Sequence, residues 1–338
     1  MAESMFPGAG RFSVVELDAH AKINLLLGVG AARSDGYHEL NSVFQTLDLS
    51  DRVRVTAHDP RDHPAPADPA TAVHSLSVTG LGARHVPTDS TNLAWKAIDL
   101  VVAEYRRRGV TSFPVFEVSI VKGIPTAGGM AGGSADAAAA VAGAEALLRD
   151  RGGPLDEATV LRICLELGSD VPFSYLGKTR LGTGRGEKLT PMLCRGTYHW
   201  VVALQRTGLS TPEVFARFDQ LVAEGRGPST PADPQGVARA LASGDPLQLA
   251  GVLRNDLSAA ALSLMPKLHS TLAAGTRAGA VAGMVSGSGP TCVFLCRNAQ
   301  QAEDVAEEII DSGKASTAVT ATGPAPGVIA VNSPLPGR

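Results

Sequence analysis

The stretch GIPTAGGMAGGSADAAAA, residues 123–140, decides how this sequence is interpreted. Its glycines run directly into alanines, and alanine is the strongest helix former. A glycine-rich segment before a helix leaves backbone N–H groups free at the positive end of the helix dipole, with no Cβ to keep an anion away. The stretch therefore predicts a phosphate-binding loop, with a plain glycine-rich turn or close helix packing as the structural alternative.

Two common nucleotide motifs do not fit this loop. Gly128 and Gly133 have the spacing of a Walker A motif, but Ser134 stands where that motif requires lysine. The letters AGGMAGG also lack the G-x-G-x-x-G pattern of a dinucleotide-binding fold. A different class of phosphate loop is needed.

Length and composition indicate a globular protein of two domains. The chain has 338 residues, which is longer than a domain built around a single hydrophobic core usually is. Hydrophobic residues make up 44% and charged residues 19%, which is ordinary globular composition. The 33 acidic and 30 basic residues give a net charge of −3 without a basic stripe, so we expect no nucleic-acid partner.

The cysteines and the N-terminus indicate a cytoplasmic protein. Four cysteines without C-x-x-C spacing are typical of reduced, buried thiols. The first eleven residues lack the basic and apolar regions of a secretory signal. The long uncharged run 278–296 is interrupted by SGSGP, so we expect no membrane span.

Two other segments bear on the site. Residues 11–29 alternate like a strand, which places His20, Lys22 and Asn24 on one face. Residues 59–72 are rich in Pro, Ala and Asp and predict a poorly ordered surface insertion. His58 and His63 lie at this insertion, and on that ground we expect no metal pair there.

Three segments, in the required order, resemble the GHMP kinases, the superfamily of galactokinase, homoserine kinase and mevalonate kinase. PTAGGMAGGSADAAAA looks like the ATP-phosphate loop of that family. AHAKINLLLGVGAARSDGYHEL lies near the N-terminus and AGMVSGSGPTCVFLC near the C-terminus, and GSDVPF matches as well. The resemblance covers about residues 20–296. One departure is Ala131, which stands where glycine is more usual and could crowd the phosphates.

The resemblance implies an α+β fold of two domains. Residues 11–195 would form an N-terminal, ATP-binding domain of the ribosomal S5 domain 2-like type, and residues 196–321 a ferredoxin-like C-terminal domain. Residues 1–10 and 322–338 would be flexible termini. The active site would lie between the domains, in a monomer or a homodimer.

The implied reaction is Mg²⁺-assisted transfer of the ATP γ-phosphoryl group to an alcohol. Such a reaction needs held phosphates, neutralised charge and an acceptor for the hydroxyl proton. Asp170 is the implied general base, with Lys22 as its cationic partner. Alone, Asp170 is equally a helix N-cap and Lys22 a surface lysine. His20 stays open between a structural histidine and a substrate contact.

The resemblance also implies the binding residues. ATP would contact Asn92, Leu93, Lys122, Pro125, Gly128, Gly129, Gly132, Gly133 and Ser134, and the Ser134 hydroxyl would also approach Mg²⁺. The substrate would contact Asn24, Tyr37, His38, Thr211, Phe215, Gly287 and Ser288. Without the resemblance, Phe215 would be read as a helix core residue and 287–289 as a hairpin turn.

The substrate implied by the motif around Tyr37 and His38 is a cytidine diphosphate-linked methylerythritol of the non-mevalonate isoprenoid pathway, phosphorylated on its 2-hydroxyl. Another GHMP kinase, acting on homoserine or mevalonate, is one alternative. A non-catalytic nucleotide-binding regulator on the same fold is another. Lys22 and Asp170 argue against the regulator, since binding alone needs neither.

Overall fold

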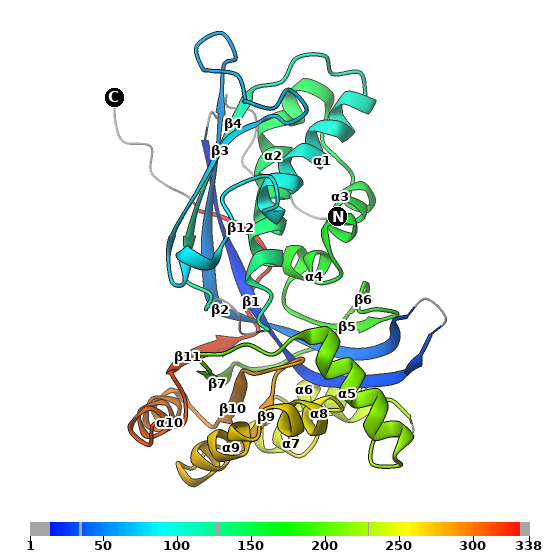
Figure 1. The fold of residues 1–338 in the computed structure, drawn as a ribbon, viewed down its shortest axis with the longest axis vertical. Coiled ribbons are helices and arrows are strands. Elements are labelled where there is room, and N and C mark those ends of the chain that lie inside the picture. The colour runs from blue at the N-terminus through cyan, green and yellow to red at the C-terminus, as the bar shows by residue number, and fades with distance from the viewer. Residues whose placement is uncertain (1–13, 34–35, 126–128, 229, 332–338) are drawn as a thin grey trace.

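The computed structural model describes residues 14–33, 36–125, 129–228 and 230–331, which form two lobes stacked end to end (Figure 1). In the described chain the N-terminal lobe has the strands β1 (Val14–Ala32), β2 (His38–His58), β3 (Val73–Gly80), β4 (Val115–Lys122), β5 (Thr179–Thr183), β6 (Lys188–Pro191), β8 (Arg254–Asn255) and β12 (Ile329–Ala330). Its helices are η1 (Ala83–His85), α1 (Leu93–Arg107), α2 (Gly132–Gly152), α3 (Glu157–Leu167) and α4 (Val171–Leu176).

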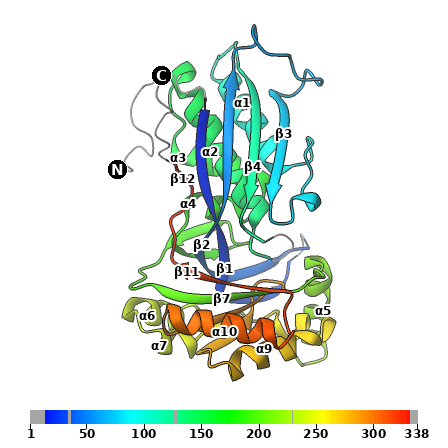
Figure 2. The same cartoon turned by 90° about the vertical axis from the view of Figure 1, so that its left-hand side faces the viewer.

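The N-terminal sheet has the order β12-β1-β2-β4-β3, with β5 and β8 pairing to the far ends of β2 and β1. Helices α1 to α4 cover one face, and the other face is open (Figures 1 and 2). Strands β1 and β2 are long enough to reach the other lobe, where Leu27 and Val29 of β1 join the second hydrophobic core. The two lobes are therefore linked by continuous strands.

The C-terminal lobe is a four-stranded sheet with helices on one side (Figure 2). Its described strands are β7 (Tyr198–Leu204), β9 (Ala282–Val285), β10 (Cys292–Cys296) and β11 (Thr317–Gly323) in the order β11-β7-β10-β9; its helices are α5 (Thr211–Ala223), α6 (Gln235–Ser243), α7 (Pro246–Ala250), α8 (Ser258–Leu264), α9 (Lys267–Arg277) and α10 (Ala299–Asp311). This order and connectivity are those of a ferredoxin-like domain. The predicted α+β class with two domains is confirmed.

Small side chains let α2 lie close to the sheet. The helix is mostly alanine along its buried length, and a Cβ at Gly143 would come within 2.7 Å of Val55 Cγ2 and 3.1 Å of Leu17 Cδ1. A larger residue there would push the helix away. Because the glycine loop precedes α2, this close packing also sets the position of the loop.

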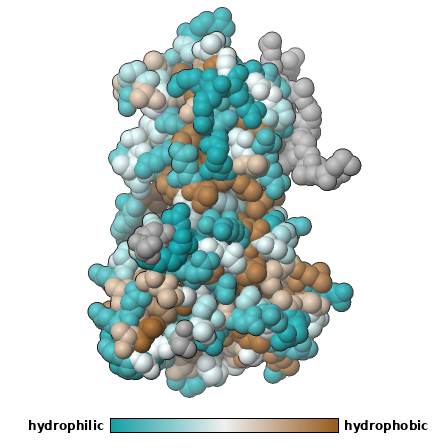
Figure 3. All heavy atoms as spheres, turned by 90° about the vertical axis from the view of Figure 1, so that its right-hand side faces the viewer, coloured by the Kyte–Doolittle hydropathy of each residue, from teal (hydrophilic) through white to brown (hydrophobic). Residues whose placement is uncertain are grey.

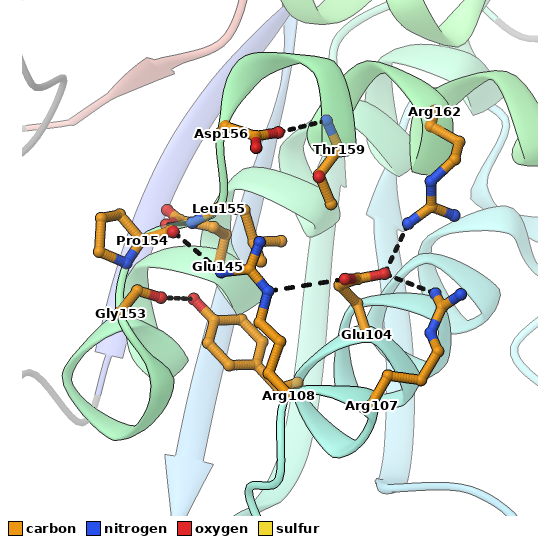
Figure 4. A network of polar contacts seen from close by, with 11 residues as sticks. Glu104, Arg107, Arg108, Glu145, Gly153, Pro154, Leu155, Asp156, Thr159 and Arg162 are labelled. Carbon is orange, nitrogen blue, oxygen red and sulfur yellow. Dashed lines mark hydrogen bonds and ion pairs between the residues drawn. The ribbon is translucent and has the colours of Figure 1, made fainter.

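A polar network fastens the outer ends of α1, α2 and α3 (Figure 4). The Glu104 carboxylate on α1 forms ion pairs with Arg107 of the same helix and with Arg162 of α3, each with an N–O distance of 2.5 Å. The hydroxyl of Tyr105 donates to the Gly153 carbonyl after α2, at 2.9 Å. These contacts therefore join the three helices in the layer that covers the sheet.

Residues 322–331 are not frayed, so the predicted C-terminal flexible segment is wrong for this part. Ala325 N donates to Thr46 O at 3.0 Å, Val328 N to Tyr175 O at 3.2 Å, and β12 pairs with the edge of β1. The buried side chains of Ala325 and Val328 and the open edge of β1 explain why the segment is held. Residues 1–10 and 332–338 lie outside the described residues, and the domain boundary at 195/196 stays a prediction.

The 59–72 insertion has defined turns rather than the poor order expected from its composition. Asp62 N donates to Asp59 O at 3.0 Å, and the Thr71 hydroxyl donates to Asp99 of α1 at 2.8 Å. Trp95 Nε1 donates to the same hydroxyl at 2.9 Å.

Among the described residues, no helix combines the length and apolar character needed to cross a bilayer.

We predict that Gly143→Leu lowers stability by about 1–3 kcal/mol, because overpacking a filled interface forces side chains and backbone to shift. Urea denaturation checks this. The exposed Asp150→Ala on the same helix is the control and should stay within about 0.5 kcal/mol of wild type. Unchanged stability in Gly143→Leu would show that α2 is free to move off the sheet.

Candidate active site

Lys22 and Asp170 face each other between the two lobes. Lys22 Nζ lies 3.5 Å from Asp170 Oδ2. The lysine side chain is buried and also donates to Asn24 Oδ1 at 3.0 Å, while the aspartate is one-third exposed. Asp170 precedes α4 but its side chain makes no capping hydrogen bond, so the N-cap alternative does not account for it.

Strand β1 brings Lys22 and Asn24 to this position through its irregular pairing with β2. The register shifts between His20 and Lys22 and again between Asn24 and Leu26. Asn24 Nδ2 donates to Ser42 Oγ at 2.7 Å, which fixes the amide so that its oxygen faces Lys22. His20 Nδ1 lies 3.0 Å from the Gly327 carbonyl, which favours the structural reading of this histidine.

The glycine loop borders a pocket of about 270 Å³. The lining residues are Val86, Lys122, Ile124, Pro125, Gly129, Met130, Ala131, Gly132, Gly133 and Asp136. Lys22 N donates to Met130 O at 3.2 Å, so β1 is tied directly to the loop. Gly128 lies outside the described residues. Ser134 is half-buried in the first turn of α2 and does not line this pocket.

Ala131 has φ 59° and ψ 32°, the left-handed conformation that favours glycine. This strained residue stands directly before α2 and lines the pocket. The departure from the usual glycine therefore costs backbone strain, of order 1–3 kcal/mol for a residue held in such a conformation.

Behind the loop lies a buried charge cluster that sequence analysis missed. Lys122 Nζ contacts Asp51 and, at 2.6 Å, Asp136 Oδ2. Asp51 also accepts hydrogen bonds from Gly123 N and Ile124 N, both at 2.8 Å. Lys122 therefore joins β2, the start of the loop and α2. The available sequence signal was Asp136, the one charged residue in the alanine run 135–140.

Within this cluster, Asp136 is the residue with a strongly shifted pKa. Burial, with the neighbouring Asp51 carboxylate, raises the pKa of Asp136 to about 8, although Lys122 opposes the shift. Its Oδ1 has no hydrogen-bond partner among the described residues. With a proton on Asp136, the cluster of one cation and one anion is neutral and does not repel phosphates from the pocket.

The C-terminal segment of the family resemblance, AGMVSGSGPTCVFLC, forms a turn that lies against β1 and α5. Asn255 Nδ2 donates to Val285 O at 2.8 Å and Gly287 O at 2.7 Å, which holds the turn. A Cβ at Gly287 would lie 3.5 Å from Asn24 Oδ1. Ser288 Oγ lies 2.8 Å from Thr211 Oγ1 at the start of α5. Two predicted substrate residues are thus in direct contact.

A larger pocket of about 680 Å³ lies between the lobes, on the side where apolar surface gathers at the waist (Figure 3). It is lined by Gly36, Tyr37, His38, Leu40, Leu165, Gly168, Ser169, Arg185, Thr211, Pro212, Phe215, Ala216 and Asp219. Four predicted substrate residues, Tyr37, His38, Thr211 and Phe215, are therefore brought together.

The wall of this larger pocket is aromatic with charged edges. The His38 and Phe215 rings lie 5.0 Å apart, and His38 Nε2 is 2.9 Å from Asp219 Oδ1. The Arg185 guanidinium lies 4.6 Å from the centre of the Tyr37 ring, which is 53% exposed. Arg185 and Asp219 were not predicted from the sequence. Its letters do not show that Arg185 lies over Tyr37, that Asp219 bonds to His38, or that both line the pocket.

Asn92 and Leu93 occupy the start of α1. Asn92 caps this helix by accepting from Ala94 N at 2.8 Å and donates to Pro87 O at 2.7 Å. The structure thus gives Asn92 a local role, and neither residue lines the smaller pocket. Their contact with adenine stays a prediction.

The Lys22–Asp170 pair is adjacent to residues of both pockets, and neither residue is itself part of the lining of either one. Asp170 follows Ser169 of the larger pocket, and Lys22 is bonded through its backbone to Met130 of the smaller one. A group held in one pocket and an alcohol held in the other would meet at a carboxylate and a cation. This geometry suits phosphoryl transfer.

Comparisons with known proteins agree with this geometry. The pattern of the GHMP kinases N terminal domain matches residues 92–178, and that of the GHMP kinases C terminal domain matches residues 237–315. The fold and the site thus define a small-molecule kinase of the GHMP class.

Curated relatives narrow this class. The 4-diphosphocytidyl-2-C-methyl-D-erythritol kinase of Nocardia farcinica is 52% identical over 93% of this chain and 95% of its own, and that of Corynebacterium efficiens is 51% identical over 91% and 93%. A crystal structure of 4-(cytidine 5'-diphospho)-2C-methyl-D-erythritol kinase has a TM-score of 0.69 at 27% identity, covering 91% of this chain and 98% of that one. The chain belongs to the 4-diphosphocytidyl-2-C-methyl-D-erythritol kinase family.

We predict that Asp136 makes stability fall as pH rises. The folded state keeps a proton that the unfolded chain, with an ordinary pKa of 3.8, releases. The stabilisation is complete below about pH 4 and is lost as pH rises to about 8, by at most ~1.4 kcal/mol per pH unit.

The measurement is the difference in unfolding free energy between wild type and Asp136→Asn across this pH range. Asparagine still accepts from Lys122 but cannot ionise, so the difference isolates the titration of one group. Wild type should lose stability relative to the variant as pH rises. A difference that is constant with pH would mean that Asp136 stays ionised beside Lys122.

Proposed function

We propose that this protein transfers the γ-phosphoryl group of ATP to the 2-hydroxyl of 4-diphosphocytidyl-2-C-methyl-D-erythritol, giving the 2-phosphate and ADP in non-mevalonate isoprenoid biosynthesis. The observation that carries the proposal is the Lys22–Asp170 pair, which is adjacent to residues of a glycine-loop pocket and of an aromatic pocket. One pocket suits nucleotide phosphates, and the other is large enough for a pyrimidine nucleotide.

Asp170 accepts the proton of the substrate hydroxyl as its oxygen bonds to the γ-phosphorus and the bond to the β-phosphate oxygen breaks. Lys22 lies 3.5 Å from this carboxylate and stabilises the negative charge on the transferring group. Asn24 holds the lysine ammonium in place at 3.0 Å. These roles require no covalent intermediate on the protein.

The backbone of Gly129, Gly132 and Gly133 and the N-terminus of α2 bind the phosphates. Mg²⁺ prefers oxygen ligands, and the Ser134 hydroxyl in the first turn of α2 fits that preference. Mg²⁺ would supply charge neutralisation between phosphate oxygens. In this proposal Ser134 is the residue that holds it.

The cytosine ring stacks in the larger pocket against Phe215 or Tyr37, with His38 at its polar edge. Asp219 orients the His38 ring through Nε2. A different GHMP kinase substrate such as mevalonate has no aromatic ring to occupy this wall. A purely regulatory nucleotide-binding protein would not need a buried lysine paired with a carboxylate at the meeting point of the two pockets.

We predict that Asp170→Asn lowers kcat by about 10²- to 10⁴-fold, the usual contribution of a general base. Binding of both substrates should persist, because the change keeps the shape of the side chain. Steady-state kinetics with ADP release, together with calorimetric titration of a non-hydrolysable ATP analogue, separates the two effects. The exposed Asp311→Asn is the control. Near-normal kcat in Asp170→Asn would remove Asp170 as the base.

We predict that Phe215→Ala raises KM for the cytidyl substrate by roughly 5- to 150-fold, since a stacked base is worth about 1–3 kcal/mol. KM for ATP should barely change, because the phosphates bind at the glycine loop. Free CDP should compete with the alcohol substrate and not with ATP.

The matched control is Phe113→Ala, a half-buried phenylalanine beside Arg106 in the N-terminal lobe. It should leave both KM values near wild type. Equal effects of Phe215→Ala on both substrates, or competition of CDP with ATP alone, would place the cytidine elsewhere and return the substrate to the wider GHMP family.

A further inference from the structure

Three histidines and a glutamate gather at the end of the N-terminal sheet, away from both pockets. His58 ends β2, His63 belongs to the 59–72 insertion, His74 lies on β3 and Glu117 on β4. The insertion lies at the end of the N-terminal lobe farthest from α5 to α10 (Figure 1). The phosphoryl-transfer reaction does not use this cluster, which we call the histidine cluster.

Strand pairing and the turn of the insertion together create the cluster. In the sheet, Glu117 pairs with Thr56 on one side and Ser75 on the other, so β4 is flanked by the strands that carry the histidines. The insertion then folds back and stacks the His63 ring on the His58 ring, with centroids 4.3 Å apart. Residues distant in sequence thereby converge on one carboxylate.

The distances suit a metal ion. His58 Nε2 lies 3.0 Å from Glu117 Oε2, and His63 Nε2 lies 3.4 Å from Glu117 Oε1. One ligand atom each from His58, His63 and Glu117 lie within 4.8 Å of one another. Donors on a tetrahedral Zn²⁺ ion with bonds of about 2.0–2.1 Å are roughly 3.4 Å apart, so small side-chain rotations would complete the site.

We propose that His58, His63 and Glu117 bind one divalent transition-metal ion of the zinc class, which fastens the 59–72 insertion to the sheet. Two imidazoles and a carboxylate are ligands that Zn²⁺ commonly takes, whereas Mg²⁺ and Ca²⁺ prefer oxygen alone. The site is distinct from any Mg²⁺ at the glycine loop and has a structural role. This reverses the expectation of no metal at His58 and His63.

His74 supports the assignment. Its ring packs edge-on against His63, with centroids 4.8 Å apart, and its buried Nδ1 has no hydrogen-bond partner among the described residues. A buried ring nitrogen without a partner is costly. His74 thus adds a third imidazole beside His63, outside the three proposed ligands.

Simple ion pairing is the competing explanation. Glu117 can pair with protonated His58 and His63, and exposed pairs of this kind contribute little. Two stacked imidazolium rings would repel each other, whereas two neutral imidazoles sharing a cation would not. A cation shared by the two rings is therefore compatible with the stacked arrangement.

The test uses the full-length protein without an affinity tag, freed of metal by a chelator. Calorimetric titration should show one equivalent of Zn²⁺ bound, and Co²⁺ should give the visible absorption of a low-symmetry, few-coordinate site. At a free Zn²⁺ concentration of 100 times Kd, the melting temperature should rise by about 5 °C, since binding stabilises only the folded state.

Variants separate a built site from incidental binding. His63→Ala and Glu117→Gln should each weaken Zn²⁺ binding by more than about 10-fold and, at the same free Zn²⁺ concentration, reduce the rise in melting temperature to about half or less. His63 belongs to a surface insertion, so its replacement keeps the core intact. The control His269→Ala removes an exposed histidine on α9 and should bind like wild type.

Failure of wild type to bind one equivalent, or binding that survives in His63→Ala and Glu117→Gln, would overturn the proposal. So would a loss of equal size in His269→Ala, because it would mean that surface histidines bind zinc generally. None of these readouts depends on kinase activity.

Discussion

The buried contacts of Lys122 with Asp51 and Asp136 are the constraint on which the rest of the site depends. Burying charges is expensive, and it succeeds here because Lys122 bridges both carboxylates and Asp51 also receives the N–H groups of Gly123 and Ile124. These contacts fix both ends of the glycine loop, one at β4 and one in the first turns of α2. Because these contacts hold its ends, the loop can leave N–H groups free to bind an anion and does not need packing among its own residues to hold its position.

The long strand β1 connects the glycine loop to the C-terminal lobe. Its backbone bonds to Met130, its side chains Lys22 and Asn24 contact each other beside Asp170, and Leu27 and Val29 pack in the C-terminal lobe. The segment after β11 returns to pair with β1 as β12. The C-terminal lobe is thus tied to the N-terminal sheet at both ends, and the wall formed by α5 is held at a defined distance from the loop.

Much of this arrangement was predictable from the sequence, because local patterns specify local structure. The alanine run predicted α2, and the alternation of residues 11–29 predicted β1 with Lys22 and Asn24 on one face. Contacts between distant segments were not predictable. Nothing in the local sequence shows that Asp51 and Asp136 share Lys122, or that residues 322–331 have a β1 edge to pair with. The composition of residues 59–72 indicated disorder, but the contacts that order them come from Asp99 and Trp95 on α1.

The two pockets differ in the parts of the fold that line them. In the proposed function the phosphates would contact backbone groups and a helix N-terminus beside a buried charge cluster, none of which reads the identity of the alcohol. The larger pocket uses the side chains of Tyr37, His38, Phe215 and Asp219, which come from a hairpin and from α5. Side chains on such elements can change without disturbing the Lys22–Asp170 pair or the loop. The proposed substrate choice and the proposed transfer chemistry therefore depend on different parts of the fold, so that the larger pocket can be altered by substitution while the Lys22–Asp170 pair is kept.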